Sequence, residues 1–278
     1  MPSALAIDNN SHDVWKAHLS LGFVQTSVRT VLKSRSHVGP LAVQRPFYPE
    51  GDVCHVYILH PPGGVVGGDE LTIHINAETG SHALITTPAA GKFYRSDGRT
   101  AKQSVNVKIA AGAVVEWLPQ ETIVFEEARL MSNNHINLED GAKFMAWEVL
   151  AFGRPAAGEG FAAGMAQLQW RISRSGKPLL NEKLLIDAEA FVAKWGLSGH
   201  CCCGSLLAYP AGKQELEIVR QIIGEQASRG VTLIDDLLIC RGMDQRADSM
   251  SIFFKQVWQA LREPLLQRKA VSPRIWAT

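Results

Sequence analysis

The chain has 278 residues, enough for one large domain or two small ones, and its 28 basic and 27 acidic residues leave a net charge of +1. A charge so close to balance argues against binding to nucleic acid or to an anionic membrane surface. No apolar run approaches the ~20 residues of a membrane-spanning helix, so no membrane protein is predicted.

The N-terminal residues 1–13 have no basic segment before an apolar stretch, which argues against a signal peptide, and we expect them to form a disordered tail. Five cysteines, three of them adjacent, are an odd number without the spacing of a disulfide framework. They are typical of a reducing compartment, so we expect a cytoplasmic protein.

From Val14 to about Leu207 apolar and polar residues alternate in short runs separated by Gly, Pro and Asn. Alternation with a period of two predicts β-strands. The clearest predicted strands are 14–19, 53–59, 70–75, 83–86, 104–109 and 167–172. The sequence therefore predicts a mainly β body over residues 14–209.

A strand–glycine–strand unit repeats within this body. It occurs at 75–83, 109–115 and 136–144, and more weakly at 172–178, around Gly80, Gly112, Gly141 and Gly176. Repeats of about 30 residues favour stacked, β-helix-like units that bury their apolar faces against one another. Ordinary hairpins in a sandwich remain the alternative, because turn chemistry is degenerate.

The segment His60–Asp69 holds two prolines and four glycines between two predicted strands. It lacks the Lys-Ser/Thr pair of a Walker loop and the spacing G-x-G-x-x-G, so we do not expect nucleotide binding. The composition favours a sharp strand-to-strand turn capped by Asp69. The alternative is that Asp69 lies on a functional groove.

After Pro210 the pattern changes, and residues 210–278 predict a helix–strand–helix segment packed on the body rather than an independent domain. A period of 3.6 predicts one helix over 213–227. Strand-like runs follow at 231–234 and 237–240. A second helix is expected from Asp248 or Ser249 to about Arg262, with Pro264 as its breaker. Two C-terminal α-helices are therefore expected.

No catalytic motif is present: the chain has neither a G-x-S-x-G elbow nor an H-E-x-x-H helix. The cluster His200–Cys203 has soft metal ligands. Adjacent side chains of a strand point to opposite faces, so four consecutive residues cannot close a tetrahedron around one ion. Buried structural thiols are the preferred interpretation.

Several long motifs, in order along nearly the whole chain, resemble those of the urease accessory proteins called UreD, or UreH in some organisms. The motifs are 39–50, 54–69, 87–96, 116–121, 153–155 and 273–276. The resemblance implies a single UreD-like domain over 14–278, with a layered β fold and β-helix-like winding.

The resemblance also implies a function. UreD proteins are not enzymes. They are scaffolds, or maturation chaperones, that bind the urease apoprotein and recruit UreF and the GTPase UreG. Nickel then passes toward the urease active site, so nickel is expected in transit and no cofactor is expected to be tightly bound.

The family is associated with a water-filled internal route lined by polar and acidic residues. Its acidic positions correspond here to Asp69, Glu148 and Glu182, which the resemblance therefore implies as transient nickel ligands. Relatives often carry Asp where Glu148 stands, and Ser or Thr where Gly91 stands.

Two other classes of function remain open. A β-solenoid carbohydrate-active enzyme would align acidic residues at matching positions of its repeats, which this chain does not do. A metalloprotein using His200–Cys203 would retain metal on purification under reducing conditions.

Overall fold

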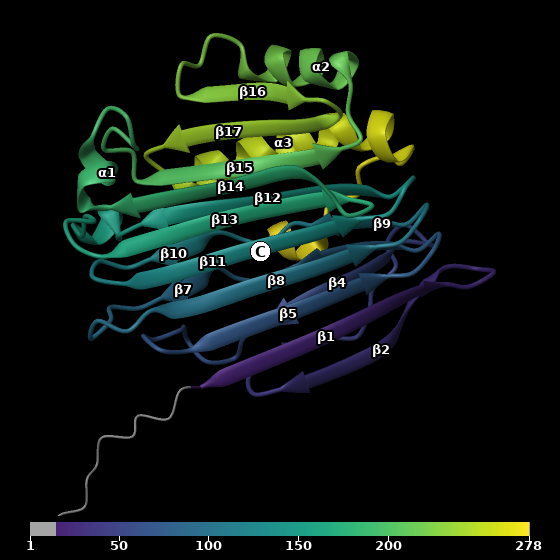
Figure 1. Cartoon of the computed structure of the whole chain (residues 1–278), viewed down its shortest axis with the longest axis horizontal. Coiled ribbons are helices and arrows are strands. Elements are labelled where there is room, and N and C mark those ends of the chain that lie inside the picture. Colours follow the sequence, from purple (N-terminus) through teal and green to yellow (C-terminus); the bar gives the residue numbers. More distant parts are fainter. Residues whose placement is uncertain (1–14, 278) are drawn as a thin grey trace, which may run out of the picture.

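A computed structural model describes residues 15–277 of the chain (Figure 1). The strands are β1 (Lys16–Gln25), β2 (Thr30–Val38), β3 (Ala42–Val43), β4 (Cys54–Leu59), β5 (Glu70–Ala77), β6 (His82–Thr86), β7 (Gly91–Phe93), β8 (Ala101–Ile109), β9 (Val114–Trp117), β10 (Thr122–Val124), β11 (Arg129–Leu138), β12 (Lys143–Phe152), β13 (Met165–Arg174), β14 (Lys177–Asp187), β15 (Cys202–Tyr209), β16 (Arg229–Ile234) and β17 (Leu237–Asp244). The helices are α1 (Ala188–Val192), α2 (Lys213–Ile223) and α3 (Ala247–Leu266), with 3-10 turns at Pro155–Ala157 and Arg274–Ala277. The predicted disordered tail, residues 1–13, lies outside the described residues.

The strands form two facing sheets. The seven-stranded sheet has the order β14-β13-β11-β8-β5-β1-β2, and the ten-stranded sheet runs β16-β17-β15-β12-β9-β6-β4-β3 with β7 and β10 at its side. Between β4 and β13 the long strands alternate between the two sheets, and each pairs in parallel with the strand one winding away. This is the predicted β-helix-like winding in a mainly β fold, which is confirmed.

Glycine turns make the winding possible. Gly80, Gly112 and Gly141 have φ angles of 73°, 68° and 79°, and each lies where the chain leaves the seven-stranded sheet for the ten-stranded one. This left-handed backbone favours glycine, which has no Cβ to clash. The fourth unit differs, because Gly176 closes an antiparallel hairpin between β13 and β14 within one sheet.

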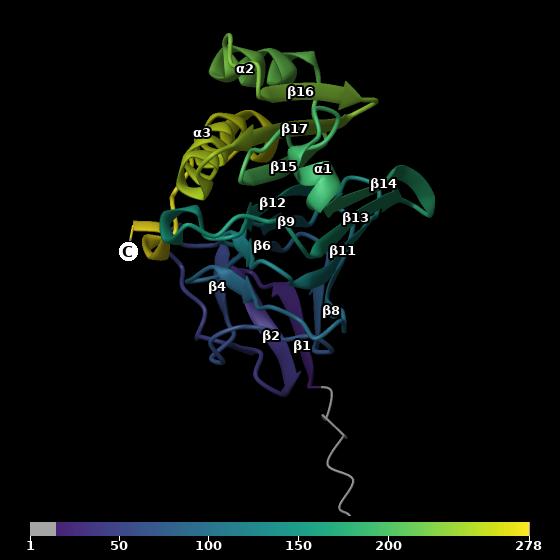
Figure 2. The same ribbon diagram turned by 90° about the vertical axis from the view of Figure 1, so that its left-hand side faces the viewer.

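Two hydrophobic cores hold the layers together. One lies between the sheets, and the other lies between the outer face of the ten-stranded sheet and the helices α2 and α3. Figure 2 shows α3 on the side of the ten-stranded sheet that faces away from the seven-stranded one. Each fully buried Leu, Val or Phe contributes roughly 1.5–3 kcal/mol to the free energy of unfolding, so α3 is an integral layer.

The C-terminal segment differs in detail from its prediction. Helix α2 ends at Ile223 rather than near 227, because Gly224 follows with φ 56°. Helix α3 begins at Ala247, one residue before the predicted caps, and continues to Leu266. Pro264 lies inside its last turn, and the left-handed Gln267 ends the helix. The strands β16 and β17 between the helices extend the ten-stranded sheet.

The Gly-rich segment His60–Asp69 crosses between the two sheets and ends in a tight turn, in which the backbone N–H of Asp69 donates to the carbonyl oxygen of Val66 at 3.1 Å. The predicted turn capped by Asp69 therefore occupies only the last four residues of the segment. The segment leads from β4 to β5, and Val65 forms a parallel bridge with Phe93. A Cβ on Gly64 would lie 2.4 Å from the ring of Tyr94, so glycine is needed there for close approach.

None of the helices in residues 15–277 has the length and apolar character needed to cross a membrane.

Candidate functional site: two cavities that share Glu148

Two cavities lie against the interior between the sheets. The first has a volume of about 510 Å³ and is bordered by the crossing segment 60–65, the loop 87–93 and the inner faces of β8, β11 and β12. The second, of about 400 Å³, lies between β12, β15 and β17 on one side and β13 and β14 on the other. Four of the motifs noted in the sequence, at 39–50, 54–69, 87–96 and 116–121, contribute to the first cavity.

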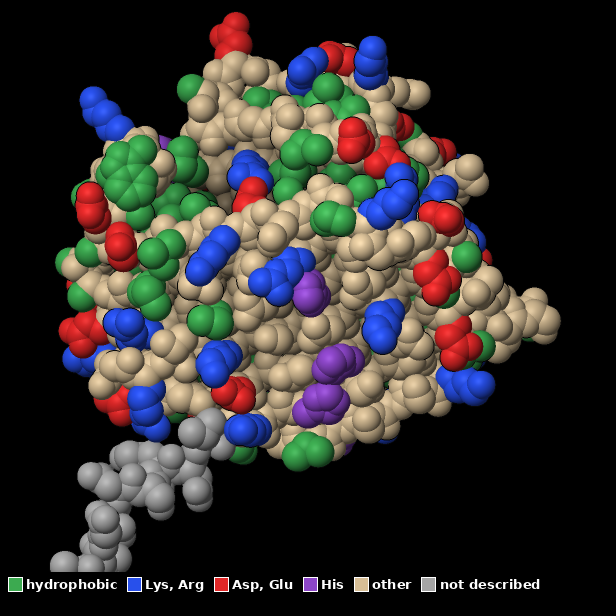
Figure 3. Space-filling view, in the orientation of Figure 1, with side chains coloured by type: hydrophobic (Ala, Val, Ile, Leu, Met, Phe, Trp, Pro, Cys, Tyr) green, Lys and Arg blue, Asp and Glu red, His purple; other side chains and the backbone are tan. Residues whose placement is uncertain are grey.

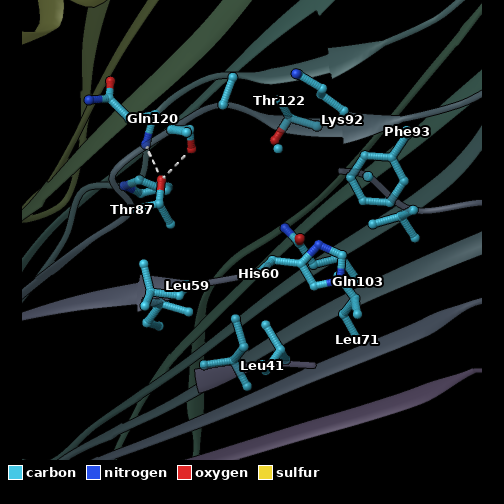
Figure 4. A pocket seen from close by; sticks show the side chains of 18 of the residues that line it. Leu41, Leu59, His60, Leu71, Thr87, Lys92, Phe93, Gln103, Gln120 and Thr122 are labelled. Atoms are coloured by element: carbon cyan, nitrogen blue, oxygen red, sulfur yellow. Dashed lines mark hydrogen bonds between the residues drawn. The ribbon is translucent and has the colours of Figure 1, made fainter. Parts of the chain in front are cut away.

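Polar side chains from several elements surround the first cavity. Figure 4 shows His60 projecting into it beside Gln103, with Lys92 and Thr122 on the opposite side. Burial lowers the pKa of His60, partly offset by the charge of Asp69, so its imidazole favours the neutral form. Thr122 pairs with Gly91, and a Cβ on Gly91 would lie 3.7 Å from the Thr122 hydroxyl. The Thr122 hydroxyl therefore lies next to Gly91, the position at which relatives often carry the hydroxyl of Ser or Thr.

Glu148 lines both cavities. Alternation along β12 explains its place: Phe144, Ala146, Leu150 and Phe152 belong to the core between the sheets, so Glu148 points into the same space. Met145, Trp147 and Val149 pack on the other face, under α3. A carboxylate stands here in a row of apolar positions, at the point where the two cavities approach each other.

The partners of Glu148 are neutral. The Ser132 hydroxyl donates to Glu148 Oε1 at 2.6 Å, and the Asn134 amide donates to the same oxygen at 3.4 Å, both from β11 of the facing sheet. Burial raises the pKa of Glu148, and these hydrogen bonds only partly counter it. A buried carboxylate without a cationic partner is costly, and a passing cation would stabilise its charged form.

A polar row continues from Glu148 into the second cavity. Strand pairing places Glu148 opposite Ser205, and Ser205 opposite Arg241. Arg241 forms an ion pair with Glu182, which comes from the seven-stranded sheet. Two of the acidic residues predicted from the resemblance, Glu148 and Glu182, thus border one cavity.

Asp69, the third predicted residue, has a structural contact. Its Oδ2 accepts a hydrogen bond of 3.1 Å from the backbone N–H of Val66, so it caps the crossing segment. It is buried and does not line either cavity, although its charge acts on His60. The structure therefore places Glu148 and Glu182 on one cavity and leaves Asp69 outside the lining of both.

The cysteine cluster divides between two environments. Cys202 belongs to the core under α3 and Cys203 to the core between the sheets, as alternation along a strand requires. Burial raises the pKa of Cys203 to about 12, which keeps its thiol protonated at neutral pH. Within residues 15–277 no group of three or more His, Cys, Asp or Glu side chains has the arrangement of a metal site.

A buried polar network under α3 was not predicted from the sequence. Arg262 of α3 is fully buried and donates from Nη2 to Glu116 Oε1 at 3.0 Å and from Nη1 to Glu50 Oε2 at 2.8 Å. Trp258 Nε1 donates to Glu116 Oε2 at 2.6 Å, and the His82 ring contacts Glu116 Oε1 at 2.8 Å. The network ties α3 to the ten-stranded sheet.

Glu116 has the opposite electrostatic environment to Glu148. Burial raises its pKa, but the hydrogen bond with His82 and the charge of Arg262 outweigh burial and lower the pKa to about 2. In the sequence, the network is marked locally by one feature: Glu116 is a single acidic residue within the apolar run 114–118. Its partners lie far away in sequence, so the chain alone did not reveal the network.

Comparison with known proteins agrees with the sequence motifs. The family described as UreD urease accessory protein matches residues 16–277. The chain is 43% identical to urease accessory protein UreD of Pseudomonas putida strain W619, with 98% of each chain covered. It is 44% identical to UreD of Alcanivorax borkumensis, over 96% of this chain and 94% of the relative, and 43% identical to UreD of Citrobacter koseri, over 98% and 96%. With a match over nearly its full length, the chain belongs to the UreD family of urease accessory proteins.

Proposed function

We propose that this chain is a non-catalytic scaffold of urease maturation that binds the urease apoprotein together with UreF and UreG and passes Ni²⁺ through its interior. Family membership supports the role in urease maturation. The observation that carries the internal route is the position of Glu148, which borders both cavities between the sheets.

The donors along this route suit transport rather than storage. Gln103, Asn134 and Glu148 offer oxygen atoms, and Ser205 and Glu182 continue the row in the second cavity. Conduction requires sites that bind an ion weakly enough to release it. Dense imidazole or thiolate ligands would hold Ni²⁺ too tightly for release, because the affinity of such sites is high late in the divalent series.

Arg241 regulates access to Glu182 in this proposal. The ion pair satisfies the carboxylate while no metal is present, and a cation entering the second cavity competes with the guanidinium for it. Because Arg241 neutralises Glu182, the second cavity carries less negative charge than it would with both Glu148 and Glu182 unpaired. The lower negative charge weakens binding of the ion and favours its release.

The test is co-expression of a urease operon with Glu148→Gln in this chain, at limiting nickel. We expect the variant to assemble with its partners, as measured by pull-down, and to yield urease with lower nickel content and activity. Gln has nearly the same volume and keeps hydrogen-bonding capacity, so a loss of delivery reflects the charge. The exposed Glu78 provides the control, because it lies in the turn after β5 and lines neither cavity, so Glu78→Gln should leave urease unchanged. Wild-type nickel content in Glu148→Gln would refute the internal route.

Asp69 and Glu182 are tested in the same assay. Asp69→Asn keeps a cap acceptor for Val66 but removes the charge near His60. If Asp69 serves only as a cap, Asp69→Asn activates urease normally while Asp69→Ala loses on the order of 1 kcal/mol of stability. If Asp69 belongs to the nickel route, both variants deliver less nickel. For Glu182, Glu182→Gln should lower delivery in the same way as Glu148→Gln.

A further inference from the structure

Two histidines meet on the outer face of the seven-stranded sheet, away from both cavities. His18 lies on β1 and His74 on β5, and the residues on either side of each are buried in the core between the sheets. Both imidazoles therefore point outward. Figure 3 shows histidine side chains gathered on this face, with carboxylates mainly toward its margins.

The strand register makes the two histidines diagonal neighbours. His18 pairs with Thr72 and Ser20 pairs with His74, so the rings reach toward each other across two parallel strands. Their centroids are 5.0 Å apart, and the ring planes are inclined by 41°. Two imidazoles whose nitrogens bind one ion at about 2.1 Å have centroids about 4.6 Å apart at a right angle and about 5.3 Å apart at the tetrahedral angle. The observed separation lies between these values.

The ring nitrogens are available for a ligand. Among residues 15–277, no hydrogen bond engages a ring nitrogen of His18 or His74. Imidazole is a preferred ligand of nickel, copper and zinc ions.

We propose that His18 and His74 form a surface site for a divalent transition-metal ion, held by one nitrogen of each ring and by water. Two protein ligands in an exposed position give an ion that exchanges readily with solvent. The site lies on the opposite side of the seven-stranded sheet from the cavities, so it does not depend on the internal route, and either proposal can fail alone.

Titration of the full chain, without a histidine tag, with Ni²⁺ in a calorimeter tests the site. We expect His18→Asn and His74→Asn each to remove one bound ion, or to weaken its affinity by about tenfold or more. His135→Asn is the matched control, since His135 is on the same face but two strands from His74, about 10 Å across the sheet. It should leave binding unchanged. Lys108→Gln should strengthen binding about two- to threefold, because it removes a positive charge that acts on His74.

A spectroscopic measurement keeps the test independent of affinity. Cu²⁺ bound to the wild-type chain should show coordination by two imidazole nitrogens in its electron paramagnetic resonance spectrum, and each single variant should lose that signature. The proposal is overturned if the His18→Asn and His74→Asn variants bind Ni²⁺ with wild-type stoichiometry and affinity. It is equally overturned if His135→Asn abolishes the same binding.

Discussion

At the scale of single residues, two buried glutamates show how environment decides the role of a carboxylate. Glu116 is surrounded by Arg262, His82 and Trp258, and the pKa of its carboxyl falls to about 2. Glu148 has only neutral donors, and burial raises its pKa. The first is a charged structural tie. The second is left without a cationic partner, which suits an ion that passes and leaves.

Arg262→Met should strongly destabilise the chain. The substitution removes the cation shared by Glu50 and Glu116 and leaves two buried carboxylates without it. Breaking a buried ion pair from one side costs about 3–5 kcal/mol, which should appear as a lower midpoint in urea unfolding.

Arg220→Ala is the control for this measurement. Arg220 pairs with Glu217 on the exposed side of α2, and we expect a change within about 0.5 kcal/mol. Equal effects of the two substitutions would contradict the structural role assigned to the network.

At the scale of elements, the loop after β12 shows which glycines the fold requires. Gly153 and Gly158 have nearly the same positive φ, 70° and 75°. A Cβ on Gly153 would lie 2.2 Å from the carbonyl oxygen of Gly160, whereas a Cβ on Gly158 would meet nothing within 4 Å. Backbone strain is thus common to both positions, and only Gly153 is also held by close packing.

Gly158→Ala should cost about 1 kcal/mol, from left-handed backbone alone. Gly153→Ala should cost about 1–3 kcal/mol more, because the new methyl group forces the facing backbone of Glu159 and Gly160 to move. Thermal unfolding of the two variants side by side measures the difference. Equal losses in melting temperature would contradict the prediction, because they would show that the backbone facing Gly153 moves aside without a loss of stability.

At the scale of the whole molecule, α3 completes the β body. It covers one face of the ten-stranded sheet, and Arg262 and Trp258 supply partners for Glu116. The strands β16 and β17 belong to the same sheet. The segment 210–278 is therefore connected to the body through a shared sheet, a shared core and a buried ion pair.

A chain cut after residue 210 should fail to fold alone. It would expose the apolar face under α3 and leave Glu116 buried beside His82 without a cation, so we expect aggregation or loss of cooperative unfolding. Co-expression of residues 211–278 as a separate chain should restore solubility, because the missing layer docks through the same contacts. A soluble fragment with a sharp thermal transition would instead mark 15–210 as an independent domain.

Much of the fold was predictable because its signals are local. A period of two along the strands and of 3.6 in α2 and α3 depends on residues only a few positions apart. The repeated glycines at 80, 112 and 141 indicated stacked units, since positive φ favours glycine wherever the chain turns. Helix ends were less accurate, as Pro264 shows, because packing of α3 outweighs the loss of one hydrogen bond.

The sequence by itself determined the β body, its repeated turns, the C-terminal helices and, through its motifs, the UreD family. Tertiary structure alone decided which distant residues meet: Glu148 with Ser205, Arg241 with Glu182, Glu116 with Arg262, and His18 with His74. Strand register follows from the packing of the whole apolar face, and a shift of one residue would turn each of the strand side chains among them to the opposite side of its sheet. Local sequence patterns do not say which distant strands and side chains face one another. The cavities and the partners of the buried charges could therefore be identified only in the assembled sheets.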